Sequence, residues 1–165
     1  MRLPDLEHLP DEARIWIFAA DRPMPEDESR AVLEAVDGFL EDWAAHGVPL
    51  SGARDWRHDR FLVVGVDESL APPSGCSIDA LVGVLKDLEV RLGVRFLGNE
   101  SVWYRTDEGV HRATRGEFKG KAQRGEVTPD VVVFDNAVTR LADLREGRWE
   151  GPARERWHGP AFFGG

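Results

Sequence analysis

Cysteine is nearly absent from this sequence: Cys76 is the only one in 165 residues. A single cysteine excludes an internal disulfide and a zinc site built from several cysteines. No apolar run approaches the roughly 18 residues of a membrane-spanning helix, and the first residues lack the apolar core of a signal peptide. We therefore expect a cytoplasmic protein that has no membrane partner.

Positive charge is also scarce. The chain has 30 acidic and 21 basic side chains, and its net charge is −9. Residues 1–50 carry 12 of the acids and only 4 of the bases, so the first predicted helix presents an acidic, solvated face. Broad nucleic-acid binding requires clustered Lys and Arg, so we do not expect a nucleic-acid partner.

The first half alternates between strand-like and helix-like segments. Strand patterns cover residues 13–21, 51–57, 60–66 and 94–97, and apolar stripes at helical spacing predict helices over about 26–45 and 77–92. His58 and Asp59 form the turn of the predicted hairpin. The order β-α-β-β-α-β over about residues 13–97 predicts an α+β fold with a ferredoxin-like split βαβ sheet. Both helices should cover one face of a four-stranded antiparallel sheet.

The second half predicts a smaller β-β-α-β lobe. Its elements are two strands around the turn at 106–109, a short helix near 117–124 and a strand at 131–134. The aromatic residues of the tail would be costly to leave in water, so we expect the tail to pack back on the body. The predicted lobes are residues 1–98 and 99–165, joined as one rigid body.

Within the second half, about 50 residues resemble the small GYF-like domains. The matching positions are Trp103-Tyr104, Gly109, Phe118, Gly125, Thr128-Pro129-Asp130, Val133, and Trp149 followed by Pro152-Ala153. The Gly-Pro that normally follows the second strand is replaced by Arg112-Ala113-Thr114. The resemblance implies an aromatic platform, Trp103, Tyr104 and Trp149, for a proline-rich or other extended peptide. The alternative is that these three residues belong to the hydrophobic core of the small lobe.

The whole chain also resembles an uncharacterised bacterial family whose members are sometimes labelled ABC-transporter ATPases. The resemblance lies in three sequence segments: Ala-Asp-Arg at 20–22, Gly-Cys-Ser-Ile-Asp at 75–79 and the segment from Thr128 to Phe134. The GxxxxGK[ST] phosphate loop of such ATPases is missing from the sequence. This resemblance implies no activity.

Cys76 is a candidate catalytic thiol. It lies one residue before Ser77, a possible cap of the second helix, where unpaired N–H groups and the helix dipole stabilise a thiolate. A catalytic thiol also requires a nearby base, and His46, His58 and His111 are the choices. The alternative is a buried structural cysteine.

Asp21 and Asp67 form a candidate pair. Each ends a predicted strand, and we expect these two strands to be adjacent and parallel, which would place both carboxylates at one sheet edge near Cys76. Paired carboxylates there could hold a divalent metal, the one cofactor considered, and act on a phosphorylated substrate. Alternatively each acid caps a turn, and Arg22 pairs with Asp67.

The predicted hairpin carries Arg54, Arg57 and Arg60 around Trp56. Such a basic, aromatic patch could contact an acidic partner or RNA, whereas an exposed edge strand protected by charges would look the same.

Two functions are compatible with these patterns. The first is a non-enzymatic adaptor that binds a protein or peptide through Trp103, Tyr104, Trp149 and Arg22, with self-association left open. The second is a small enzyme at Asp21, Asp67 and Cys76, with metal-dependent chemistry on a phosphorylated substrate or thiol chemistry on an acyl substrate.

Overall fold

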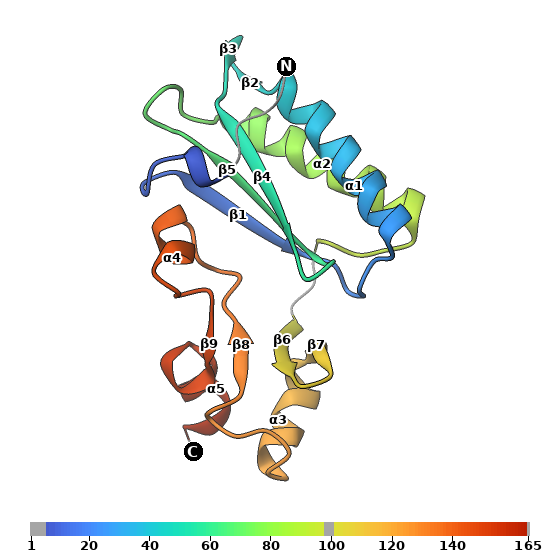
Figure 1. The fold of residues 1–165 in the computed structure, drawn as a ribbon, viewed down its shortest axis with the longest axis vertical. Helices are drawn as coiled ribbons and strands as arrows, with labels where there is room; N and C mark the ends of the chain where they lie inside the picture. Colours follow the sequence, from blue (N-terminus) through green and yellow to red (C-terminus); the bar gives the residue numbers. More distant parts are fainter. Residues whose placement is uncertain (1–5, 98–100, 165) are drawn as a thin grey trace.

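The chain folds into two stacked lobes of mixed α and β structure (Figure 1). The computed structural model describes residues 6–97 and 101–164. Within these residues, no helix combines the length and apolarity that crossing a bilayer requires.

The first lobe is a three-stranded antiparallel sheet with two helices on one face. The sheet order is β1-β5-β4, and the strands are β1 (Arg14–Ala19), β4 (Gly52–Arg57) and β5 (Phe61–Val66). The helices α1 (Glu26–Glu41) and α2 (Gly75–Leu92) lie side by side over it (Figure 1). Every residue of β5 is buried, as its unbroken apolar sequence predicts for a central strand.

Alternation along β5 divides its side chains between two cores. Leu62, Val64 and Val66 pack against Val32 and other apolar residues of the helices. Val63 faces the opposite side, where it joins Leu6, Leu9, Ala13, Ile15, Ala53 and Leu141. The second core is covered by the short helix η1 (Leu6–His8) and by α4 (Leu141–Arg145), which comes from the C-terminal half of the chain. The segment before α4 also bonds to the sheet, since its Thr139 carbonyl accepts from the Ile15 amide of β1.

Both helices of the first lobe have other bounds than expected, and an unpredicted hairpin follows the first. The first helix ends at Glu41 rather than near residue 45, because Trp43 turns inward and its Nε1 donates to the Ser77 carbonyl at 2.9 Å. The chain then makes a small hairpin, β2 (Ala44–Ala45) and β3 (Val48–Pro49). The second helix begins at Gly75, because Ser74 forms the N-terminal capping box with Ser77.

Residues 94–97 do not form the fourth strand. Their chain approaches β1 through one backbone hydrogen bond, from the Asp21 amide to the Arg95 carbonyl. The next two amides, those of Phe96 and Leu97, donate to a side-chain oxygen of Glu89 instead of to a strand. The carboxylate of Glu89 thus takes the donors that a sheet ladder would need.

The second lobe contains a four-stranded sheet of order β7-β6-β8-β9. The strands are β6 (Ser101–Thr106), β7 (Gly109–Thr114), β8 (Val132–Phe134) and β9 (Glu150–Pro152). α3 (Arg115–Gln123) packs Phe118 into the lobe's core, η2 (Ala153–Glu155) follows β9, and α5 (His158–Phe163) ends the chain. Phe162 and Phe163 lie against Phe118, so the aromatic tail packs back on this lobe.

His158 is the most buried polar side chain of the tail. It has no solvent-exposed surface, its ring stacks on Trp157, and neither ring nitrogen has a hydrogen-bond partner among the described residues. Burial lowers the pKa of His158 to about 4, and the nearby charges of Arg115 and Arg156 act in the same direction. The neutral imidazole is therefore the form that the folded chain accepts.

We predict that His158 makes the fold acid-sensitive. In an unfolded chain a histidine has a pKa of about 6.5, so the unfolded state takes up the proton first as the pH falls. The contribution of His158 is complete above about pH 6.5 and declines by about 1.4 kcal/mol per pH unit toward pH 4. Urea unfolding of the wild type and His158→Leu over this range measures it. Parallel pH curves for the two proteins would contradict the prediction.

Candidate functional site

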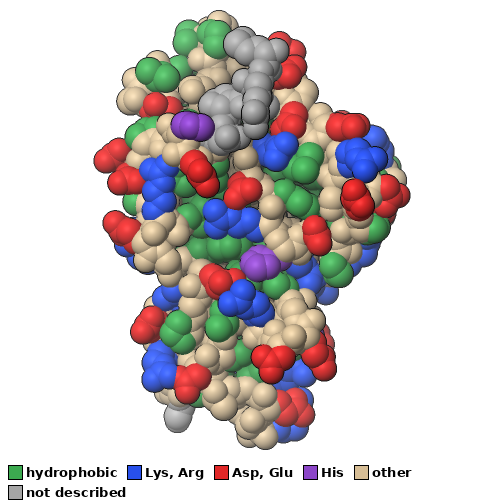
Figure 2. Space-filling model, viewed as in Figure 1, with side chains coloured by type: hydrophobic (Ala, Val, Ile, Leu, Met, Phe, Trp, Pro, Cys, Tyr) green, Lys and Arg blue, Asp and Glu red, His purple; other side chains and the backbone are tan. Residues whose placement is uncertain are grey.

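The two lobes meet at a buried aromatic cluster. Its members are Ala19 and Phe61 from the first lobe and Trp103, Phe134 and Trp149 from the second lobe. Phe61 is central: its ring lies 4.8 Å from that of Phe134 and 5.2 Å from that of Trp149, the latter edge to face. We call the surface around this cluster the waist; Figure 2 shows histidine, basic and acidic side chains gathered there.

This packing corrects the expected aromatic platform. Trp103 and Trp149 are buried against Phe61 of the first lobe, so they do not offer exposed faces to a peptide. Tyr104 is 8% exposed and lies between His111 and Phe118 in the second lobe. The three residues of the proposed platform are therefore core, and the interface between the lobes uses two of them.

Arg60 also joins the lobes. It is buried, and its guanidinium donates to the Ala20 carbonyl of the first lobe and to the Val110 carbonyl of the second. Burial lowers the pKa of this guanidinium, and the charge of Asp21 opposes that effect. Arg60 is consequently not part of an exposed basic patch on the hairpin.

The turn of the β4–β5 hairpin places His58 at the waist. His58 and Asp59 both have φ of 55°, and the Arg60 amide donates to the Arg57 carbonyl, which is the pattern of a type I′ turn. The turn was predicted at these residues. Asn-Gly is the usual sequence for such a turn, so His and Asp hold a conformation that costs them free energy.

The His58 ring contacts both lobes. Its centroid lies 6.0 Å from that of Phe61, 5.4 Å from that of Phe134 and 6.2 Å from that of Trp149. Its Nε2 lies 3.4 Å from Oε1 of Glu150, which begins β9. The same carboxylate oxygen lies 3.1 Å from Nη1 of Arg105, an ion pair whose geometry does not make a hydrogen bond.

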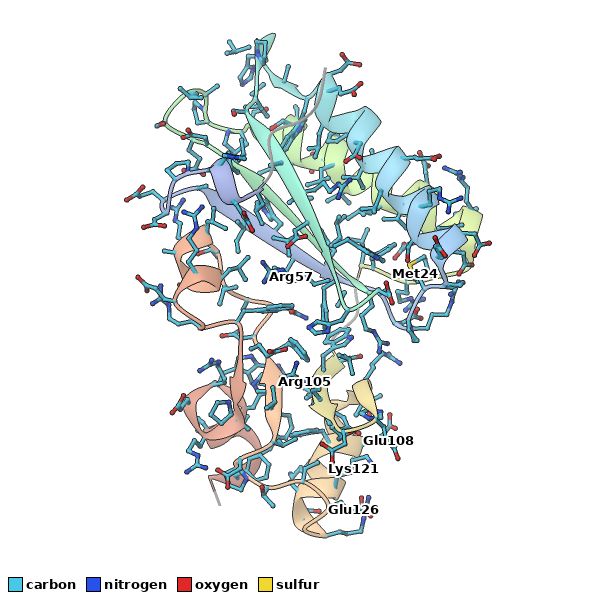
Figure 3. All side chains as sticks on the ribbon, in the orientation of Figure 1. Met24, Arg57, Arg105, Glu108, Lys121 and Glu126 are labelled. Carbon is cyan, nitrogen blue, oxygen red and sulfur yellow. The ribbon has the colours of Figure 1, made fainter. Side chains whose placement is uncertain are left out.

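Arg57 borders this group from the first lobe, and Arg105 from the second (Figure 3). The Nε of Arg57 donates to Asp55 at 2.7 Å, and its guanidinium lies over the Trp149 ring, 5.5 Å from the centroid. Its two terminal nitrogens make no hydrogen bond within the described parts of the chain. The guanidinium is thus held in place while its terminal edge stays available.

Two surface pockets adjoin at Arg57. One has a volume of about 430 Å³ and is lined by Arg57, His58, Leu144, Gly147, Trp149 and Glu150. The other, of about 370 Å³, shares Arg57 and Leu144 with it and is also lined by Leu6, Glu7, Arg54, Asp55, Leu141 and Arg145. We call the two together the waist groove. Arg145 is already occupied, because it donates to Asp11 and to the carbonyls of Glu7 and Leu9.

Asp21 and Asp67 do not meet. β1 and β5 are adjacent, but they are antiparallel, with Arg14 opposite Val66 and Ala19 opposite Phe61. Asp21 and Asp67 therefore lie beyond opposite ends of the sheet, separated by about 20 Å, the length of a six-residue strand. Asp21 accepts from the Arg95 amide, and Asp67 accepts from the amide and hydroxyl of Ser69. The expectation of parallel strands was wrong, and the shared metal site fails with it.

Cys76 is exposed in the first turn of α2, so the alternative of a buried structural cysteine is wrong. Asp21 contacts Arg95, just beyond the other end of that helix, so the thiol and this carboxylate are far apart. No hydrogen bond joins Cys76 to a histidine in the described residues, which also hold no cluster of three or more metal-ligating side chains. The three proposed catalytic residues do not form one site.

Arg22 has a structural position. It makes two hydrogen bonds to Glu28, at 2.8 and 3.0 Å, and a third to the Leu92 carbonyl. The bond to Glu28 raises the pKa of Arg22 and lowers that of Glu28. The expected partner, Asp67, lies at the other end of the sheet. Arg22 thus links the first turn of α1 to the C-terminal end of α2 through hydrogen bonds.

Sequence reasoning missed the residues that the waist brings together. Arg57 and His58 were noticed only as hairpin residues, and Leu144 and Glu150 carried no signal. The one available indication was the histidine in a tight turn, a position that favours asparagine or glycine. The chain matches no protein-family model, no curated protein and no solved structure.

We predict that Asp59→Gly stabilises the fold by about 1 kcal/mol, because glycine adopts positive φ without the steric cost that aspartate bears. The Asp59 carbonyl keeps its bond to the Met24 amide in this variant. Urea unfolding provides the measurement. Asp27→Gly, in the exposed first turn of α1, is the control and should destabilise. A loss of stability in Asp59→Gly would contradict the strained turn.

Proposed function

We propose that this protein is a non-enzymatic binding module that takes an acidic, extended segment of a protein partner into the waist groove. The observation that supports this most directly is the state of Arg57. Its Nε is bonded to Asp55, its face lies on Trp149, and its terminal nitrogens are unbonded at the junction of two pockets.

An arginine held in this way is suited to a carboxylate. The two terminal nitrogens form a planar fork that can donate two parallel hydrogen bonds to one carboxylate. Because Asp55 and Trp149 already fix the guanidinium, little of its rotamer freedom remains to be lost on binding. The pairing with Asp55 also shows that a carboxylate fits beside this guanidinium.

Apolar surface beside Arg57 favours a peptide over a small anion. Leu144 lies in both pockets, with Trp149 on one side and Leu6 and Leu141 on the other. An extended chain places successive side chains on opposite sides, so an acidic residue at Arg57 can be flanked by an aliphatic residue over Leu144. The two pockets together provide a groove rather than one enclosed cavity.

The net charge of −9 does not oppose an acidic ligand at close range. The excess of acids lies in residues 1–50, whereas the rest of the chain, which supplies Arg57, Arg105 and Trp149, has 18 acids and 17 bases. At physiological ionic strength, charges more than about 8 Å apart are largely screened. The groups in contact with the ligand therefore decide its preference.

The enzymatic alternative has lost its geometric basis. Asp21 and Asp67 lie at opposite ends of the sheet, so a metal shared by them is not supported. Cys76 is exposed at a helix start, and no described base is bonded to it. The binding function requires only groups that the waist brings together.

We extend the proposal to the fold of each lobe. β5 lies between β1 and β4, and both helices cover one face, which supports a ferredoxin-like first lobe that lacks its fourth strand. The order β6-β7-α3-β8 supports a GYF-like second lobe. A cytoplasmic location remains the expectation from the sequence.

We predict that short peptides with a central glutamate bind and that Arg57→Gln weakens this binding at least about tenfold, since a hydrogen bond to a charged group contributes about 1.5–3 kcal/mol. The measurement is fluorescence polarisation with a set of nine-residue peptides. Each has Glu or Gln at its centre and aliphatic residues beside it.

The matched control is Arg30→Gln on α1, which makes the same change in charge at an exposed i,i+4 pair with Glu26. It should leave peptide affinity unchanged. Equal binding of the Glu and Gln peptides, or full affinity in Arg57→Gln, would refute the proposed function.

A further inference from the structure

The second lobe carries another pocket, away from the waist groove. It has a volume of about 500 Å³ and lies between the β6–β7 turn and the end of α3. We call it the acidic cup; its main lining residues are Tyr104, Asp107, Glu108, His111, Lys121 and Glu126. Figure 3 shows Glu108, Lys121 and Glu126 on the same side of this lobe.

The charge of the cup is negative. Lys121 lies 3.7 Å from Glu126, which also pairs with Arg124 at 3.1 Å. Asp107 and Glu108 stand in the β6–β7 turn and make no ion pair with any described residue. The cup thus holds three carboxylates against one ammonium, and two of the carboxylates are not neutralised.

Tyr104 provides an independent indication of a ligand. It is more than nine-tenths buried, with its ring stacked on His111 and packed on Phe118. Its hydroxyl makes no hydrogen bond with a described residue, and the hydroxyl oxygen keeps some solvent-accessible surface. Because Tyr104 lines the cup, the accessible end of its side chain opens there. Buried tyrosine side chains usually bond their hydroxyl to a partner, and this hydroxyl has none among the described residues, so it can bond a polar group that enters the cup.

The wall of the cup is ordered before any ligand binds. His111 Nε2 lies 2.7 Å from the Thr106 hydroxyl, which also accepts from the Glu108 amide. These contacts fix the imidazole against Tyr104 and fix the turn that carries Asp107 and Glu108. A preordered wall lowers the entropic cost of binding.

We infer that the acidic cup is a receptor for a cationic side chain, the lysine or arginine of a protein partner. The charged end of that side chain lies beside the carboxylates of Asp107 and Glu108 and donates to the hydroxyl of Tyr104. Its aliphatic stem packs on Val127, which also lines the cup. This site prefers the charge opposite to that of the waist groove, and it does not depend on the function proposed for the groove.

The test is an NMR titration of ¹⁵N-labelled protein with three probes of similar size. Nα-acetyl-lysine methylamide and Nα-acetyl-arginine methylamide carry the cation, and Nα-acetyl-norleucine methylamide is its neutral counterpart. At least one cationic probe should give saturating shifts for amides of residues 106–111 and 124–127, and norleucine should give none there. Absence of shifts with both cationic probes, or equal shifts with norleucine, overturns the inference.

Two variants connect the shifts to the cup. Glu108→Gln removes one unpaired carboxylate, and Tyr104→Phe removes only the hydroxyl while the ring remains in the core. Each should weaken the cationic probe severalfold, with the spectrum of the rest of the lobe preserved. Glu155→Gln, an exposed glutamate in η2, is the control and should bind as the wild type does. Unchanged affinity in either cup variant overturns the inference.

Discussion

The contact of Phe61 with Trp149 and Phe134 is the interaction on which the rest of the structure depends. Phe61 is the first residue of the central strand, and its ring leaves the first sheet at the end where the second lobe stacks. The hairpin turn immediately before it carries His58, and the Trp149 ring lies under Arg57. The same packing therefore joins the lobes and sets the geometry of the waist groove.

Polar contacts reinforce this junction. Arg60 donates to carbonyls of both lobes, and Glu150 of the second lobe lies within ion-pair distance of His58 from the first. On the other side of the sheet, α4 contributes Leu141 to the core beneath η1, and Arg145 binds that segment. Burial of apolar surface supplies the main driving force, while the charged groups fix the orientation. The acidic cup lies outside this junction and depends only on packing within the second lobe.

Local patterns in the sequence predicted local structure well. The continuous apolar run of residues 61–66 predicted a central strand, and the stripes of α1 and α2 predicted helices over one face. Long-range geometry was not available in the same way. The sequence pattern indicates that Trp103 and Trp149 are buried, but it does not indicate that they pack against Phe61 of the other lobe. It also could not show that Glu89 would take the amides of Phe96 and Leu97, which removed the fourth strand. The antiparallel direction of β1 and β5 follows from the antiparallel split βαβ sheet that the sequence predicted, so the expected parallel pairing of Asp21 and Asp67 conflicted with that fold.

The measurement that tests this account most directly is native-state hydrogen exchange in Val36→Ala. Val36 lies in the helix-covered core of the first lobe, away from the waist, and its truncation should cost about 2 kcal/mol. If the Phe61 cluster makes the two lobes one cooperative unit, amides of Val63 in β5 and Val133 in β8 should lose protection by the same free energy. If protection falls in β5 and stays unchanged in β8, the lobes unfold independently and the central role of Phe61 is contradicted.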